Sequence, residues 1–499
     1  MIASSSTGVG VGVGLGLLPA LILGGGALVC AAVAVSRPRM RPSLYRWFTV
    51  LAAAGAFTAS MIELVSLRPD HNGVGLVAYS GGLMVDRFHV FGTVLVLLVL
   101  VLTVLGAETY LRRSPARAGA FCALLQLSAA AAVMLVAQRE MAAFTAAFAL
   151  LLVCLVLLTA MTKTSGPTAE AAFRQVLVGG VALATTVYGL VLIYGATGTT
   201  DLSRLDSGVR VDGPLVTVGM ALVVIGLLAV IGAPPLQSWM RDTQETTPGA
   251  IAGFSSALGA VTGTTVLLRF AVEGFGAGSS RWMLLVTSVA VMAMLTGAIL
   301  ALRATTVRRL IADLSIAQSG FLLLAVGATG RGIDGTVASG PIALLFALMG
   351  AATAVVAALL LAGIFDAAGL PPGIAAYRGV GRRAPATAAF LSLALLSLAG
   401  LPPLAGFFGR VLIAESALNA GAGWAVAIAG VAMVLAAVAV LRWLMAMYAE
   451  DNGEAPFAVS TTPLTSRAAA WTAAGLGVLV AALAAPLIAL ANGGAGALH

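Results

Sequence analysis

The sequence contains a single lysine, Lys163, among 27 basic residues. Charged residues of either sign make up only 9% of its 499 residues, whereas a soluble domain carries about 25%. Mean hydropathy is +1.05, and apolar runs of the roughly 20 residues needed to cross a bilayer recur from end to end. The scarcity of charge excludes a soluble protein and predicts a polytopic membrane protein with almost no soluble part.

Cysteine and histidine are also scarce, with three of each. The cysteines lie far apart and form no CxxC pair, the histidines show no ligand spacing, and no glycine-rich phosphate loop is present. We therefore expect no metal, redox or nucleotide cofactor in this chain. The net charge of +8 is attributed to cytoplasmic arginines of a membrane protein rather than to nucleic-acid binding. The residues are Cys30, Cys122, Cys154, His71, His89 and His499.

The apolar runs predict an all-α fold of about 14 transmembrane helices, because only helices satisfy the backbone of such runs within lipid. The first run lacks a basic leading segment and a cleavage site, so we expect a retained helix rather than a signal peptide. The predicted spans are 8–35, 47–66, 89–110, 118–137, 141–162, 174–195, 214–233, 249–270, 283–303, 310–329, 341–365, 386–419, 423–447 and 469–491.

Arginines gather in alternate connections between these spans. Clusters follow the first span at 37–46, the third at 112–117, the ninth at 303–309 and the eleventh at 378–383. Because basic connections stay in the cytoplasm, this pattern predicts a multi-pass protein of the cytoplasmic (inner) membrane with both termini outside.

Two double prolines interrupt the apolar pattern. The segment GLPPL (400–404) places Pro402 and Pro403 inside the twelfth span, and GAPPL (232–236) places Pro234 and Pro235 at the end of the seventh. Because the two sites are five helices apart, an odd number, halves related in this way would run in opposite directions through the membrane. Proline-broken helices at matching positions are typical of inverted-repeat transport folds, although double prolines also recur at helix ends by chance.

Six further segments accompany these breaks: GGLMVDRFHVF, EAAFRQVLVGG, LIYGATGTTDLSRL, PPLQSWMRDTQETTPGAIAGF, RRLIADLSIAQSGFLLLAVG and YRGVGRRAP. Together they resemble the antiporter-like subunits of respiratory complex I, most closely subunit N of the NADH–quinone oxidoreductase. The resemblance implies a subunit of that oxidoreductase without a redox site of its own. NADH, FMN, iron–sulfur clusters and quinone would be bound by partner subunits. Other membrane-arm subunits and the lipid bilayer would surround this chain.

The same resemblance divides the chain into four units. Helices 1–3 occupy 1–117, and a first antiporter-like repeat of helices 4–8 occupies 118–270. A second, inverted repeat of helices 9–13 follows at 283–447, and a cytoplasmic loop with helix 14 occupies 448–499.

The departures from the family concern its proton path, which runs through a glutamate in helix 5 and lysines in helices 7, 8 and 12. Counted from the motifs, these positions fall at Ala149, Val230, Ala260 and Arg410. A buried lysine can load and release a proton, whereas arginine is effectively always protonated. We therefore hypothesise that this chain has lost the lysine-based path and acts as a structural or coupling element.

Arg410 and Glu415 are the only charges predicted well inside one span, and so they remain the proton-path candidates. Five residues correspond to about 140° around a helix, so we expect each to face a different partner. Arg410 could form a charged gate in a residual water path, or it could be held by backbone carbonyls freed at the proline break or by a neighbouring subunit.

The other ionisable residues lie near predicted helix ends. Glu63, Glu108, Asp313 and Asp366 are expected to be solvated or paired with nearby arginines, and His89 is expected at the membrane interface. Two other functions stay open from the sequence. One is an ion-translocating subunit of a related cation antiporter or membrane hydrogenase, and the other is an independent solute carrier.

Overall fold

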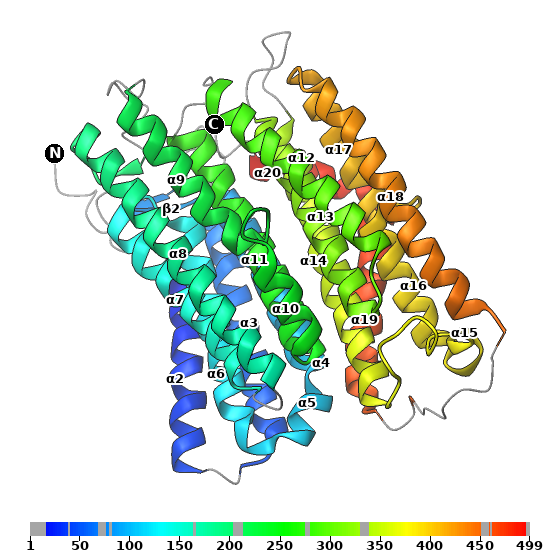
Figure 1. The fold of residues 1–499 in the computed structure, drawn as a ribbon. Helices are drawn as coiled ribbons and strands as arrows, with labels where there is room; N and C mark the ends of the chain where they lie inside the picture. The colour runs from blue at the N-terminus through cyan, green and yellow to red at the C-terminus, as the bar shows by residue number, and fades with distance from the viewer. Residues whose placement is uncertain are drawn as a thin grey trace.

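The structure, a computed structural model, describes residues 16–37, 40–67, 76–78, 82–162, 166–202, 213–274, 280–329, 339–450, 459 and 462–495. These residues form a bundle of long helices that run up and down side by side (Figure 1). Thirteen helices of the described residues are long and apolar enough to cross a membrane. The remaining predicted span, 386–419, consists of two shorter helices separated by the double proline.

The helices follow one another with short connections. Their bounds are α2 (Leu18–Ser36), α3 (Pro42–Ser66), α4 (Arg87–Gly106), α5 (Glu108–Arg113), α6 (Ala118–Ala137), α7 (Met141–Ala160), α8 (Gly166–Thr197), α9 (Pro214–Ile231), α10 (Ser238–Thr246), α11 (Gly249–Arg269), α12 (Ser280–Leu302), α13 (Val307–Gly327), α14 (Gly340–Ala367), α15 (Val380–Arg383), α16 (Pro385–Ala399), α17 (Ala405–Asn419), α18 (Gly423–Tyr448), α19 (Leu464–Ala482) and α20 (Ala484–Ala495).

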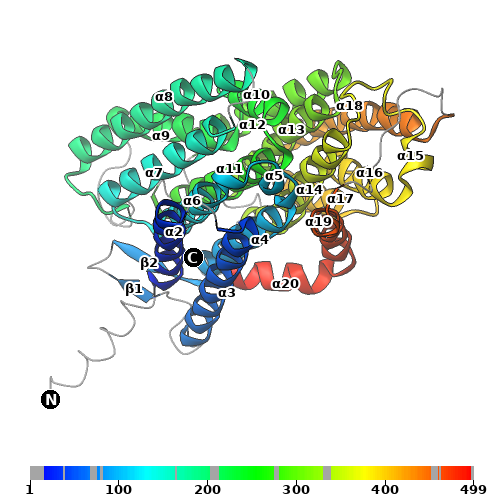
Figure 2. The same cartoon turned by 90° about the horizontal axis from the view of Figure 1, so that it is seen from below.

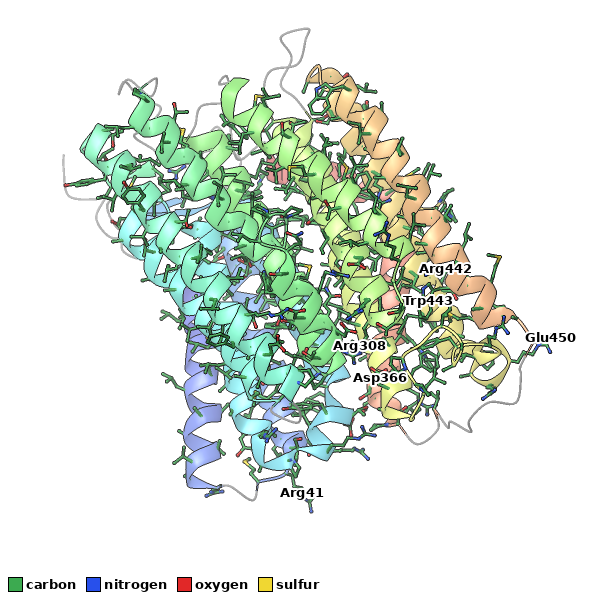
Figure 3. All side chains as sticks on the ribbon, in the orientation of Figure 1. Arg41, Arg308, Asp366, Arg442, Trp443 and Glu450 are labelled. Carbon is green, nitrogen blue, oxygen red and sulfur yellow. The ribbon has the colours of Figure 1, made fainter. Side chains whose placement is uncertain are left out.

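Arginines mark one end of the bundle, which is called the basic end below. Arg41 precedes α3, Arg112 and Arg113 close α5, and Arg382 lies in α15. Figure 1 shows α5 and α15 at the lower end of the bundle, and Figure 3 places Arg41 there. The helix α2 begins at the other end, and α20 lies there too.

Short strands occur before α4, in a connection for which the all-α prediction expected no regular structure. The strands β1 (Leu76–Ala78) and β2 (Leu83–Val85) pair antiparallel, with Val77 opposite Met84. This connection is too short for a further helix, and pairing satisfies the backbone hydrogen bonds of its apolar residues.

The core of the bundle consists of α11, α13 and α14. The apolar windows of α13 and α14 are completely buried, whereas about a third of those of α2, α3, α8 and α18 is buried. Small residues bring the central helices together: Gly249 of α11 lies against the backbone of Leu359 and Gly363 in α14. Such contacts are typical of membrane helix pairs. The outer helices carry the exposed apolar faces that lipid or other subunits can cover.

Each double proline lies between two helices. Pro234 and Pro235 separate α9 from α10, and Pro402 and Pro403 separate α16 from α17. The helix before each break ends in a left-handed glycine, with φ 74° at Gly232 and 76° at Gly400, a conformation that glycine adopts without steric cost. Both proline–proline peptide bonds are cis. The short helix α10 continues the direction of the seventh span towards the basic end (Figure 1).

The last predicted span, 469–491, is wrong in its second half. The helix α19 ends at Ala482, and α20 turns across the bundle to pack on α14 and α4 (Figure 2). Pro486 explains the break, because a proline ring clashes with the carbonyl four residues earlier, here that of Ala482.

Candidate functional site

Arg410 lies in the first turns of α17, and only 4% of its surface is exposed. Its guanidinium reaches back across the proline break. It donates hydrogen bonds to the carbonyls of Leu398, at 2.5 Å, and Ala399. These carbonyls belong to the last turn of α16, which has no continuing helix to satisfy them.

Two residues of α13 complete the surroundings of Arg410. Gln318 accepts a hydrogen bond from Nη2 through Oε1 at 3.1 Å, and the guanidinium carbon lies 4.0 Å from the centre of the Phe321 ring. Among the described residues, no carboxylate pairs with this arginine. The positive charge is therefore held by backbone dipoles, one amide and one aromatic face.

Glu415, the second proton-path candidate, points elsewhere. It is exposed on α17, whereas Arg410 is buried on the same helix. The structure therefore does not bring the two candidates together, in agreement with their spacing along the helix.

The three other family positions carry apolar side chains, and Val230 and Ala260 pack in the hydrophobic core. Val230 is 2% exposed at the end of α9, and its carbonyl lies against Gly259 of α11, next to the partly buried Ala260. Ala149 is partly buried on α7. None of the three side chains can carry a proton.

Ion pairs tie α10 to its neighbours near the basic end. Arg241 of α10 pairs with Asp313 of α13 at 2.7 Å, and Asp242 accepts from Arg174 of α8 at 2.9 Å. Trp239 anchors the same helix, because its indole N–H donates to the carbonyl of Ala229 at 2.6 Å. Asp313 is paired with an arginine, which is one of the two alternatives expected for it. The sequence did not indicate that this partner would lie on α10.

A second set of pairs lies beside it. Arg308 binds Asp366 at 2.6 Å and also donates to the carbonyls of Gln244 and Thr247, which joins α13, α14 and the end of α10 (Figure 3). Glu108 pairs with Arg46 at 2.5 Å and with Arg112 at 2.6 Å. Glu108 and Asp366 are thus paired with arginines, which is one of the two alternatives expected for them from the sequence.

The opposite end contains a buried cluster that the sequence did not predict. Asp86 binds Arg269 of α11 through both carboxylate oxygens, at 3.0 and 3.1 Å, and caps α4 by accepting from the backbone N–H of His89. His89 is completely buried inside the bundle, in the first turn of α4, which Asp86 caps. Its expected position at the membrane interface stays a prediction. Glu63 of α3 lies 4.0 Å from its Nε2 atom.

The fold of this chain is shared with solved membrane proteins. A chain of the Mrp complex from Dietzia sp. DQ12-45-1b superposes with a TM-score of 0.84 at 19% identity, covering 96% of this chain and 97% of that one. A chain of an archaeal membrane-bound sulfane sulfur reductase gives 0.84 at 22% identity over the same shares. At these identities the match shows the fold alone, which this chain shares with chains of both membrane complexes.

Sequence similarity identifies the family. The chain belongs to the NADH:quinone oxidoreductase/Mrp antiporter transmembrane family, whose model matches residues 139–436. It is 30% identical over 464 residues to NADH-quinone oxidoreductase subunit N 2 of Rhizobium meliloti, covering 92% of this chain and 93% of the relative. A subunit N 2 of Acidobacterium capsulatum is 32% identical over 440 residues, or 84% of each chain. A chain of respiratory complex I from Thermus thermophilus superposes with a TM-score of 0.77 at 26% identity, covering 94% of this chain and 98% of that one.

Proposed function

We propose that this chain is a subunit N-type membrane-arm subunit of a complex I-type NADH–quinone oxidoreductase, and that it has lost the lysine-based proton path of that family. Electron transfer takes place in partner subunits, and this chain contributes to the membrane arm as a structural or coupling element. The similarity to subunit N along nine-tenths of the chain supports the first part.

The surroundings of Arg410 carry the second part. A proton-carrying group must release its proton during the cycle, and a guanidinium does not do so. This guanidinium also uses its N–H groups as fixed donors to the carbonyls of Leu398 and Ala399. These contacts favour a structural role, in which Arg410 connects α16 to α17 across the break, rather than a role in moving charge. The apolar contacts of Val230 and Ala260 leave no titratable partner at the neighbouring family positions.

The arrangement of units follows from the same reading. Two inverted halves at 118–270 and 283–447, with helices 1–3 before them and helix 14 after them, are supported by the matching glycine geometry at Gly232 and Gly400. The arginines of the basic end favour a cytoplasmic position for that end, with both termini on the other side.

An ion-translocating subunit of a cation antiporter or a related membrane complex is the second candidate. The higher TM-scores of the Mrp and sulfane sulfur reductase chains favour it, but fold similarity alone does not separate these assemblies. The relatives at 30% identity and above are subunits N, and we therefore place complex I first.

The test is the number of protons moved per electron by the intact assembly in sealed vesicles. We expect a lower ratio than in a complex whose subunit N carries the family's glutamate and lysines, measured in parallel with the same donor and quinone. An equal ratio would show that the path is intact by another route. Purification of the chain without quinone-site or iron–sulfur partners would instead overturn the assignment to complex I.

A further inference from the structure

Glu63 is a carboxylate on the buried face of a helix that is otherwise largely exposed. On α3, its neighbours Ile62 and Val65 are 53% and 81% exposed, whereas Glu63 is 1% exposed. It continues the stripe of buried positions that includes Ala56 and Ser60. Neither carboxylate oxygen has a hydrogen-bond partner among the described residues, so an ionised Glu63 would be a buried charge without a donor, which is strongly unfavourable.

The imidazole of His89 on the adjacent helix α4 lies close to this carboxylate. Its Nε2 atom lies 4.0 Å from Oε2 of Glu63, and His89 is completely buried. The hydroxyl of Thr93 lies 3.5 Å from the same nitrogen, and Nδ1 has no partner among the described residues. A small rotation of the Glu63 side chain would bring carboxyl and imidazole into hydrogen-bond contact, because the gap exceeds a normal bond by only about 1 Å.

Among the described residues, the nearest charges around this pair come from α4 and α11. Asp86 and Arg269 neutralise each other through a two-oxygen contact, and Arg87 is exposed. Arg139, which follows α6, lines the same small cavity as Arg269. The described parts of α2 and α20, which also pack against α3 or α4, contain no Asp, Glu, Lys, Arg or His. The one titratable group of α2 is the buried thiol of Cys30, which lies nearer the basic end of that helix.

We propose that Glu63 and His89 form a site for one exchangeable proton, carried on the Glu63 carboxyl and relayed by the neutral His89 imidazole. With no proton, the pair would contain an unpaired buried carboxylate. With two, an imidazolium would lie beside the Asp86–Arg269 pair without a counter-charge of its own. One proton on the carboxyl leaves both groups neutral, which is the state that apolar surroundings favour.

The site lies near the end of the bundle opposite the basic end. Glu63 lies one turn from the end of α3, and His89 is the third residue of α4. Towards the basic end, α4 continues with the buried apolar residues Val96, Leu97 and Leu100. The hydroxyl of Ser60 is used by its own helix. The proton therefore exchanges with one side of the membrane, and the site lies outside the family's path in helices 5, 7, 8 and 12.

The test is infrared spectroscopy of the assembled complex in lipid, which detects the C=O stretch of a protonated carboxylic acid. We expect Glu63→Gln, which keeps the side-chain shape, to remove one such band at neutral pH. The matched control Glu450→Gln changes an exposed carboxylate after α18 (Figure 3) and should leave the band unchanged. On transfer to heavy water the band should shift, since the proton exchanges.

A third variant, His89→Gln, tests the relay. The carboxyl band should remain, but its shift in heavy water should become roughly a hundredfold slower, the lower range for loss of a proton-transferring group. Identical spectra for the wild type and Glu63→Gln would overturn the proposal, and so would a band that never shifts. Unchanged exchange in His89→Gln would exclude the imidazole as relay. These readouts need no turnover, so they are independent of the electron-transfer assay that tests the proposed function.

Discussion

Replacement of Arg410 by methionine distinguishes a structural role of this residue from a role as a proton carrier. The substitution removes three hydrogen bonds and leaves the carbonyls of Leu398 and Ala399 and the Gln318 amide oxygen without a donor. Each unsatisfied acceptor costs about 1–3 kcal/mol. Removal of a buried charge is itself favourable and offsets part of this cost. We therefore expect a net local destabilisation of about 3 kcal/mol at the break between α16 and α17.

Amide hydrogen exchange at the break measures this destabilisation directly. A loss of about 3 kcal/mol in local opening free energy corresponds to exchange about a hundredfold faster. The affected amides include Gly400 and Leu401, which donate to carbonyls of α16. The equivalent break at Gly232 lies on other helices and should exchange unchanged, which provides an internal reference.

Arg442 of α18 offers a matched control. It also donates to two carbonyls released at a helix end, those of Leu302 and Ala304, each at 2.8 Å. Unlike Arg410, it is exposed (Figure 3) and lies within the last two turns of α18. We expect water at this helix end to reach the two carbonyls when Arg442 is replaced, so Arg442→Met should change stability by no more than about 0.5 kcal/mol. If Arg410→Met left amide hydrogen exchange unchanged and lowered the proton-to-electron ratio, the structural role would be refuted in favour of a role in the proton path.

Two further substitutions test the ion pairs at the two ends of the bundle. Asp86→Asn should destabilise the contact between α4 and α11 by about 3–5 kcal/mol, because Arg269 loses its buried carboxylate; thermal unfolding no earlier than in the wild type would contradict this. Burial raises the pKa of Glu108, but Arg112 and Arg46 outweigh it and hold that pKa below 4.5. A carboxylate whose pKa is lowered in the folded protein stabilises the fold at pH values above its ordinary pKa. This stabilisation is lost as the pH falls through the pKa of the carboxylate in the folded protein. The stability lost in Glu108→Gln should therefore be constant above about pH 4.5 and shrink only in stronger acid, and a loss that vanished near neutral pH would exclude these pairs as its source.

The sequence predicts the elements of this fold better than their contacts. Apolar length locates the spans because each helix must satisfy its own backbone in lipid, and the double prolines locate the breaks because proline removes a helix hydrogen bond. The same rule, applied to Pro486, would have ended α19 where it ends; the apolar run concealed the signal.

The partners of the buried charges could not be predicted in this way. Asp86 and Arg269 are separated by 183 residues, and no local pattern brings α4 to α11. His89 lies at the start of a predicted span, and nothing in the local sequence indicated that it would be buried beside the cap formed by Asp86. Whether a residue of a membrane helix faces the bundle interior or the lipid depends on the helices packed around it. Hydrophobic periodicity indicates this poorly where nearly every position of the helix is apolar.

Arg410 shows why the residue type at a break carries more information than its charge. The carbonyls of Leu398 and Ala399 belong to consecutive residues, and one guanidinium satisfies both with two nitrogens of a rigid fork while a third contact reaches Gln318. A lysine offers a single nitrogen and gains mobility that suits proton exchange. The contacts that make arginine fit this break therefore hold the charge in place. At this position, an arginine in place of a lysine makes the helix break more rigid and, through the same contacts, removes the proton that could be released.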